Sequence, residues 1–205
     1  KIPAVSTVHS EFPVERPFVS DRITKYICIR ESILDKVVEY DCIPREKTIH
    51  IPNGFDTERF NKNYIPIENN PEVILFVGTI DEIRKTAITH LLNFCSEFDY
   101  DLQIIGTRVE NYLDGHPNWL EVDGEKKSIW NIEKYVKQCD YTAGVTLGRT
   151  TIEGWLCGKS AFVYDLNIFG KVTGVAIHEP PSDVGKYDIK NIVDRIERVY
   201  LEAMV

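Results

Sequence analysis

Short apolar runs alternate with amphipathic segments along almost the whole chain. An apolar run of four to eight residues predicts a strand that is covered on both faces. Strands separated by segments of helical period are typical of a parallel sheet with helices on both of its faces, so we predict an α/β fold. The predicted strands are Ala4–Val8, Tyr26–Ile29, Thr48–Ile51, Val73–Val77, Leu102–Ile105, Leu120–Val122, Thr142–Thr146 and Ala161–Tyr164.

The segments between these strands carry apolar residues at helical spacing. The last segment is the clearest, because six apolar residues share one face and Asp188 stands where an N-cap is expected. The apolar face consists of Ile189, Ile192, Val193, Ile196, Val199 and Tyr200. The predicted helices are Ser32–Tyr40, Glu82–Phe94, Ile129–Gln138, Thr150–Cys157 and Asp188–Ala203.

A break in the pattern lies at Asn61–Pro71, which is polar, spaced by prolines and without helical period. Before it stand about three strands and one helix, too few for a complete α/β domain. We therefore predict the tail of one domain in residues 1–70 and a complete second domain in residues 71–205. This imbalance indicates a fragment of a larger protein.

The composition of the chain argues against several classes of function. The net charge of −8 argues against a nucleic-acid partner, because such binding depends on clustered Lys and Arg. No run approaches the roughly 20 apolar residues of a membrane span. The five cysteines form no Cys-x-x-Cys pair and the histidines are widely separated, so the sequence supports no metal site. We expect a cytoplasmic protein, with peripheral attachment to the inner face of a membrane left open.

The segment from Gly148 to Asp165 carries the strongest chemical signal. A helix that starts directly after a glycine turn presents free N–H groups and its positive dipole end to an anion. Gly148, Arg149 and Thr150 are therefore candidates for binding a diphosphate, and Glu153 could accept hydrogen bonds from ribose hydroxyls. The alternative is an ordinary strand, turn and helix with Glu153 in solvent.

A second candidate is the strand Val73–Val77 with the residues that follow it. Gly78 permits close approach to the backbone, and Arg84 or Lys85 could clamp a diphosphate. The alternative is a glycine turn followed by two solvated charges. His9, after an apolar strand, could reach a ligand, although a lone histidine is more often structural.

Two other patterns are interpreted as structural. Gly154–Ser160 has three residues between its glycines where a Walker A loop has four, so Gly158 is better interpreted as a helix C-cap. Asn53-Gly54 follows a strand and predicts a turn.

Taken together and in order, these segments resemble the GT-B glycosyltransferases, specifically the retaining enzymes of family 4. Four segments carry the resemblance, which extends over nearly the whole chain. Tyr26–Ser32 resembles the family's strand and serine-containing turn, and Ile51–Asp56 with Phe60 is similar to its Pro-Asn-Gly-x-Asp element. The others are Leu75–Ile80, which matches the opening strand of the second domain, and Gly148–Gly158, which matches the donor-site helix.

The resemblance implies two Rossmann-like domains, the second of which binds a nucleotide-diphosphate sugar such as a UDP-sugar. Arg84, with Lys85 beside it, stands where the family has its phosphate-binding lysine, and Glu153 matches the ribose-binding glutamate. His9 matches a first-domain histidine near the transferred sugar. The implied reaction, part of carbohydrate biosynthesis, moves the sugar to a hydroxyl acceptor with retention and without a metal.

The implied donor-binding set consists of Gly78, Thr79, Gly148, Arg149, Thr150 and Glu153. Thr79 stands where the family usually has arginine, and Val145 where it has a glutamate that contacts the donor sugar. Most of the acceptor domain is also missing. These departures leave two alternatives: a non-catalytic nucleotide-sugar-binding domain and a sugar-nucleotide epimerase of similar fold.

Two expectations concern the chain in solution. As a fragment it would transfer sugar poorly, since the acceptor side is incomplete. The apolar face of Asp188–Ala203 would be covered by a second copy of the chain.

Overall fold

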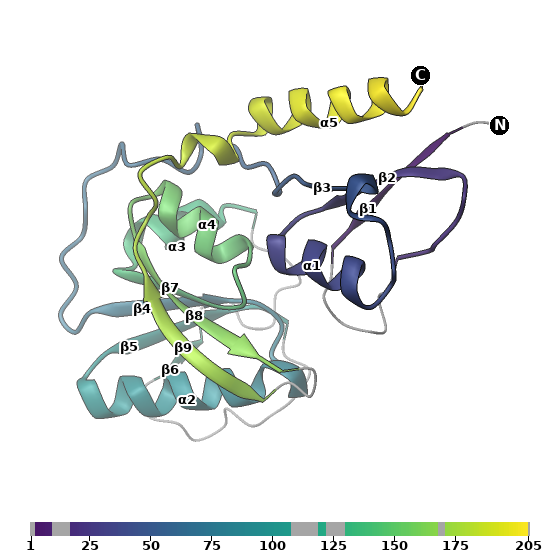
Figure 1. The fold of residues 1–205 in the computed structure, drawn as a ribbon. Coiled ribbons are helices and arrows are strands. Elements are labelled where there is room, and N and C mark those ends of the chain that lie inside the picture. Colours follow the sequence, from purple (N-terminus) through teal and green to yellow (C-terminus); the bar gives the residue numbers. More distant parts are fainter. Residues whose placement is uncertain (1–2, 10–16, 108–118, 122–129, 168–170, 205) are drawn as a thin grey trace. The chain divides into compact units, whose positions relative to one another are not determined.

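A computed structural model describes residues 3–9, 17–107, 119–121, 130–167 and 171–204. The chain divides into two compact units (Figure 1). The first unit combines Lys1–Thr57 with Gly185–Val205, and the second is Glu58–Val184. The final helix thus belongs to the same compact unit as the first strands, whereas the sequence grouped it with residues 71–205.

The first unit is a parallel sheet in the order β1-β2-β3, formed by Ala4–Val8, Ile23–Cys28 and Thr48–His50. Successive residues of a strand point to opposite faces. Accordingly, Tyr26 and Cys28 pack with the apolar residues of α1 (Glu31–Glu39), while Ile27 packs with α5 (Ile189–Ala203). The sheet therefore carries a helix on each face.

Helix α5 begins at the N-cap Asp188, as predicted, and this carboxylate accepts a hydrogen bond from the backbone N–H of Lys190. Its residues Ile192 and Val199 are buried against Ile27 and Ile51 of the same chain. The unit itself covers Ile192 and Val199, whereas Ile189, Val193 and Tyr200 on the same helix are 42%, 44% and 50% exposed. Nothing in the described part of the structure supports the predicted self-association, which stays a prediction.

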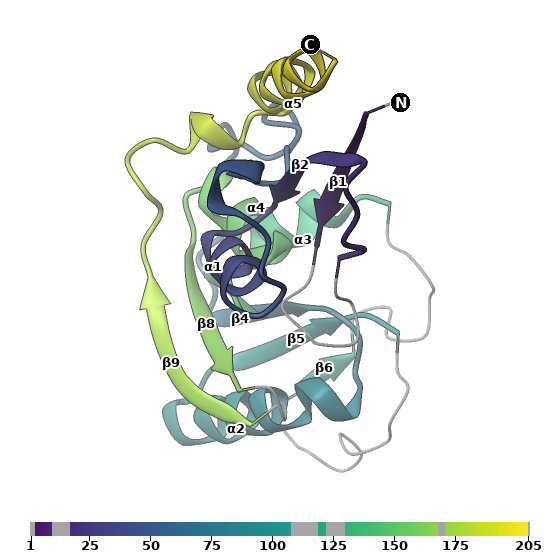
Figure 2. The ribbon, with the colours of Figure 1, turned by 45° about the vertical axis from the view of Figure 1, so that its right-hand side comes forward.

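The second unit is a six-stranded sheet in the order β6-β5-β4-β7-β8-β9, whose strands are labelled in Figure 1. Figure 2 shows β9 beside β8. The strands are β4 Val73–Val77, β5 Asp101–Ile105, β6 Trp119–Glu121, β7 Tyr141–Val145, β8 Ser160–Leu166 and β9 Val172–His178. All neighbouring pairs are parallel except β8 and β9. Helix α2 (Glu82–Phe98) packs on one face, and α3 (Ile132–Gln138) and α4 (Arg149–Leu156) lie on the other. The predicted α/β fold is confirmed.

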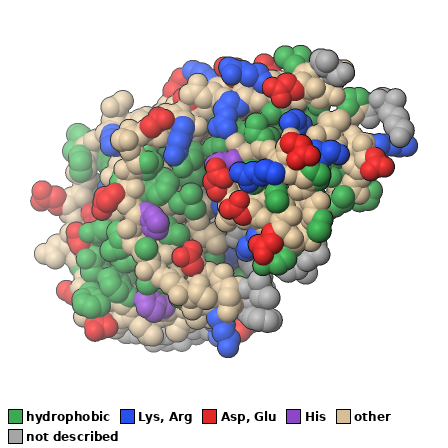
Figure 3. Space-filling model, in the orientation of Figure 1, with side chains coloured by type: hydrophobic (Ala, Val, Ile, Leu, Met, Phe, Trp, Pro, Cys, Tyr) green, Lys and Arg blue, Asp and Glu red, His purple; other side chains and the backbone are tan. Residues whose placement is uncertain are grey.

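Strand β9 is an addition that the sequence analysis missed. It is an antiparallel edge strand, and its residues Val175 and Ile177 are 42% and 55% exposed. An exposed edge strand has no continuous apolar run, which was the pattern used to find strands. Figure 3 shows hydrophobic side chains over β8 and β9, with acidic and basic side chains interspersed on the same face of the molecule.

Some element bounds also differ from the predictions. The third helix begins at Ile132, whereas the predicted start, Ile129, lies outside the described residues, as does Val122 at the end of a predicted strand. Helix α2 continues to Phe98, four residues beyond the predicted end.

Helix α4 is held tightly on the sheet. A Cβ atom on Gly154 would lie 2.5 Å from the Thr142 hydroxyl of β7, so only glycine permits this approach. The helix ends as predicted at Gly158, whose φ of 78° is left-handed. The N–H groups of Gly158 and Lys159 donate to the carbonyls of Trp155 and Gly154, which is a Schellman motif.

Candidate functional site

The order of the strands marks one edge of the second unit. The chain runs outward from β4 to β5 and β6, then returns to place β7 on the other side of β4. In open parallel sheets, ligands bind outside the carboxyl ends of the strands where the order reverses. That point lies between β4 and β7, whose ends lead to α2 and α4.

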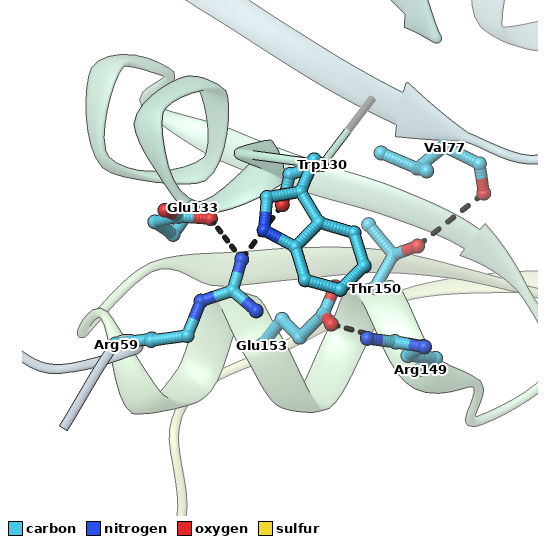
Figure 4. A network of polar contacts seen from close by, with 7 residues as sticks. All are labelled: Arg59, Val77, Trp130, Glu133, Arg149, Thr150 and Glu153. Carbon is cyan, nitrogen blue, oxygen red and sulfur yellow. Dashed lines mark hydrogen bonds and ion pairs between the residues drawn. The ribbon is translucent and has the colours of Figure 1, made fainter. Parts of the chain in front are cut away.

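The start of α4 is fastened to the end of β4. The Thr150 hydroxyl donates a hydrogen bond to the Val77 carbonyl, at 3.3 Å (Figure 4). The N-cap, Gly148, is extended and has no side-chain cap. The first-turn N–H groups of α4 therefore donate no hydrogen bond to an N-cap side chain, and they lie next to the end of β4.

The turn before α4 contains an uncommon backbone conformation. Thr146 has a φ of 58°, which is costly for a β-branched residue. Such strain persists only where the surrounding structure imposes it, and it concentrates at binding and catalytic sites. The N–H of Thr146 donates to the Tyr164 carbonyl at 2.8 Å, which extends the β7–β8 pairing into the turn.

Two glycines allow the ends of β4 and β5 to lie close together. A Cβ atom on Gly106 would be 1.8 Å from the Gly78 carbonyl oxygen, so no larger residue fits there without moving the turn. A Cβ atom on Gly78 would be 3.7 Å from Nε of Arg84. The Arg84 side chain thus lies close to the backbone of Gly78, while its predicted contact with a diphosphate stays a prediction.

Asp81 is the N-cap of helix α2 and contacts Arg84 twice. Its Oδ1 accepts the Arg84 backbone N–H at 2.9 Å, which caps the helix, and its Oδ2 accepts from the guanidinium Nη1. Nζ of Lys85 donates to Oε2 of Glu82 at 3.2 Å, a contact between side chains alone.

Helix α4 carries a third ion pair, between Arg149 and Glu153. Nε of Arg149 donates to Oε1 of Glu153 at 2.7 Å. The Glu153 side chain is only 2% exposed, whereas that of Arg149 is 72% exposed. Burial raises the pKa of Glu153 above its ordinary value of 4.5, and the Arg149 hydrogen bond opposes this rise. The alternative that Glu153 stands in solvent is therefore wrong.

Each cation predicted to bind a diphosphate thus contacts an acid of its own helix turn. These acidic partners were not predicted from the sequence, although their spacings of three and four residues are a recognised signal for helical ion pairs. The pairs are Asp81–Arg84, Glu82–Lys85 and Arg149–Glu153.

Arg59 is another residue that the sequence analysis missed. Its Nη2 donates to Oε2 of Glu133 at 2.6 Å and to the Trp130 carbonyl at 2.8 Å (Figure 4). The positive charge of Arg59, like that of Arg149, opposes the rise in the pKa of Glu153 that burial causes. No motif signalled this contact, because it joins residues more than 70 positions apart.

His9, Thr79 and Val145, which the sequence also singled out, lie in different environments. His9 is exposed directly after β1 and belongs to the first unit, so its role stays a prediction. Thr79 is half-buried after β4. Val145 packs against the apolar core on the α2 side of the sheet.

The described part of the chain contains no group of three or more His, Cys, Asp or Glu residues that could hold a metal ion. Within the same ranges, no helix has the length and apolar character needed to cross a membrane.

The chain is similar to solved structures of glycosyltransferases. A glycosyltransferase from Rickettsia africae matches with a TM-score of 0.61 and 14% identity, over 88% of this chain and 63% of that one. Anabaena HepE, in complex with UDP and glucose, matches with a TM-score of 0.53 and 14% identity, over 98% and 64%. Sucrose-phosphate synthase from Thermosynechococcus elongatus matches with a TM-score of 0.53 and 14% identity, over 98% and 60%.

These similarities establish the fold. The chain has the GT-B fold over the part that it spans, which is less than two thirds of the length of each of these structures. No protein-family model and no curated protein matches the chain. At 14% identity the likeness carries no substrate or activity with it.

The raised pKa of Glu153 predicts how stability depends on pH. Because the folded protein binds this proton more tightly than the unfolded chain, the parent gains stability as the pH falls through the raised pKa toward 4.5. Glu153→Gln cannot titrate at this position. The free energy of unfolding of the parent, minus that of the variant, should therefore rise as the pH falls within this window and stay constant below it.

Denaturant unfolding of both proteins over a pH series measures this difference. A difference that falls with decreasing pH would show that the pKa of Glu153 is lowered by Arg149 and not raised by burial.

Proposed function

We propose that the second unit binds the diphosphate of a nucleotide sugar at the ends of β4 and β7, and that the whole protein transfers the sugar to an acceptor hydroxyl with retention. The observation that carries this proposal is the hydrogen bond from Thr150 to Val77. This bond holds the start of α4 against the end of β4, at the point where the strand order reverses.

The groups near this edge suit a diphosphate leaving group. The backbone N–H groups at the start of α4 and the guanidinium groups of Arg84 and Arg149 are donors to phosphate oxygens. Such donors stabilise the negative charge that develops on the diphosphate as the sugar leaves. In this proposal Gly78 and Thr79 supply backbone near the phosphates and Lys85 adds a further charge.

Glu153 is proposed to bind the ribose. One of its oxygens accepts from Arg149, and a carboxylate has two oxygens with about four lone-pair sites, which leaves acceptor capacity for ribose hydroxyls. The carboxylate is buried, and the hydrogen bond from Arg149 offsets part of the cost of that burial. UDP is the first candidate nucleotide, since the similar Anabaena structure is described as a complex with UDP and glucose.

A non-catalytic nucleotide-sugar-binding protein is the second candidate. Val145 favours it, since this side chain packs in the core and offers no polar group to a donor sugar. Formation of a glycosylated product from a UDP-sugar and a hydroxyl acceptor would decide for transfer, and nucleotide binding without product would decide for the second candidate.

Removing either guanidinium should weaken nucleotide binding. We expect Arg84→Gln and Arg149→Gln each to raise the Kd for UDP by about tenfold, because each loses a charge-assisted hydrogen bond to phosphate. Isothermal titration calorimetry against UDP, GDP and ADP and their sugars measures this effect. Lys171→Gln, which removes an exposed cation beside the edge strand β9, is the control and should bind like the parent. Equal affinities in all four proteins would refute the phosphate assignment.

The ribose contact can be tested with a second ligand. The parent should bind 2′-deoxyuridine diphosphate about tenfold more weakly than UDP, because the ligand loses a hydrogen bond to a charged group. In Glu153→Ala the two ligands should bind within about twofold of each other, since the acceptor is gone. If the variant still prefers UDP by the parent's factor, Glu153 does not contact the 2′-hydroxyl.

A further inference from the structure

The Asp81–Arg84 pair combines two functions in one carboxylate. One oxygen caps α2 through the Arg84 backbone N–H, and the other neutralises the guanidinium of the same residue. The two side chains are 22% and 35% exposed, so the pair is partly withdrawn from water. An ion pair in this position interacts more strongly than one that is fully exposed.

The placement of Asp81 also opposes anion binding. The guanidinium of Arg84 lies over the Gly78 backbone, at the end of β4. A phosphate that reaches this guanidinium meets the Asp81 carboxylate on the same group. Two like charges that share one cation repel each other, and the cation cannot give its full attraction to both.

We propose that Asp81 is the counter-ion of Arg84 that an incoming diphosphate displaces. The inference rests on the proposed function and deepens it, because it assigns to Asp81 control over how tightly the site holds phosphate. Displacement leaves Asp81 on the helix cap while Arg84 turns its donors to the ligand. The carboxylate therefore lowers the affinity for the nucleotide and favours release of a nucleoside diphosphate after transfer.

If Asp81 served only as the N-cap of α2, the loss of its charge would leave UDP binding unchanged. Substitution by asparagine distinguishes this capping role from the proposed role as counter-ion of Arg84. Asn is as good an N-cap as Asp, so Asp81→Asn retains the cap and removes only the charge. Asp81→Ser is a second variant that also caps without a charge. The melting temperature of each variant, measured before the binding experiments, reports whether α2 remains intact.

The matched control is Glu97→Gln. Glu97 is exposed near the opposite end of α2, so this variant removes the same charge from the same helix at a distance from Arg84. Uridine is the control ligand, because it has a base and a ribose but no phosphate.

The test is a double-mutant cycle on the Kd for UDP, measured by calorimetry. Asp81→Asn should bind UDP about tenfold more tightly than the parent, whereas Glu97→Gln should change the Kd by less than about twofold. The gain from Asp81→Asn should be larger with Arg84 present than in an Arg84→Gln background, because only then is a competing ion pair removed. Uridine should bind the parent and Asp81→Asn equally.

Two results would overturn the inference while the proposed function stands. One is weaker binding of UDP by Asp81→Asn, which would mean that the carboxylate positions Arg84 for the ligand. The other is an equal gain with and without Arg84, which would mean that Asp81 only repels phosphate from a distance. A parent that binds no nucleoside diphosphate would overturn the proposed function, and the inference with it.

Discussion

The proposed site depends on one constraint, the adjacency of β4 and β7 in the sheet. These strands are distant in sequence but neighbours in space, with their carboxyl ends at the same edge. The Thr150–Val77 hydrogen bond then fixes the first turn of α4 against the end of β4. Gly154 and Gly106 permit the close packing that this arrangement needs. If β4 and β7 were not neighbours, the turns at Gly78 and Gly148 would lie on separate surfaces.

The electrostatics of this edge differ from those of a simple cationic pocket. Arg84, Lys85 and Arg149 each contact an acid on their own helix, and the chain carries a net charge of −8. Intrahelical pairs of this kind contribute only a few tenths of a kcal/mol each to an isolated helix. In the proposed site a phosphate would compete with these carboxylates for the three cations. The proposal therefore makes affinity for an anion depend on the acids as well as on the cations.

The sequence predicted the parts that depend on local pattern. Apolar runs located β4 and β7, the spacing of apolar residues located α5, and Gly158 ended α4 as expected. Strand β9 was missed because an exposed edge strand lacks that pattern, and Arg59 was missed because its contact with Glu133 joins distant segments. The burial of Glu153 depends on how α4 packs, so it could not be deduced from its position in a helix.

The central claim is that the two loops at the ends of β4 and β7 bind one ligand together. A titration of the ¹⁵N-labelled chain with UDP, followed by amide chemical shifts, tests this most directly. The account predicts that amides of Gly78–Lys85 and of Gly148–Thr151 shift with a single common Kd. Shifts confined to one of the two loops, or two different dissociation constants, would contradict it.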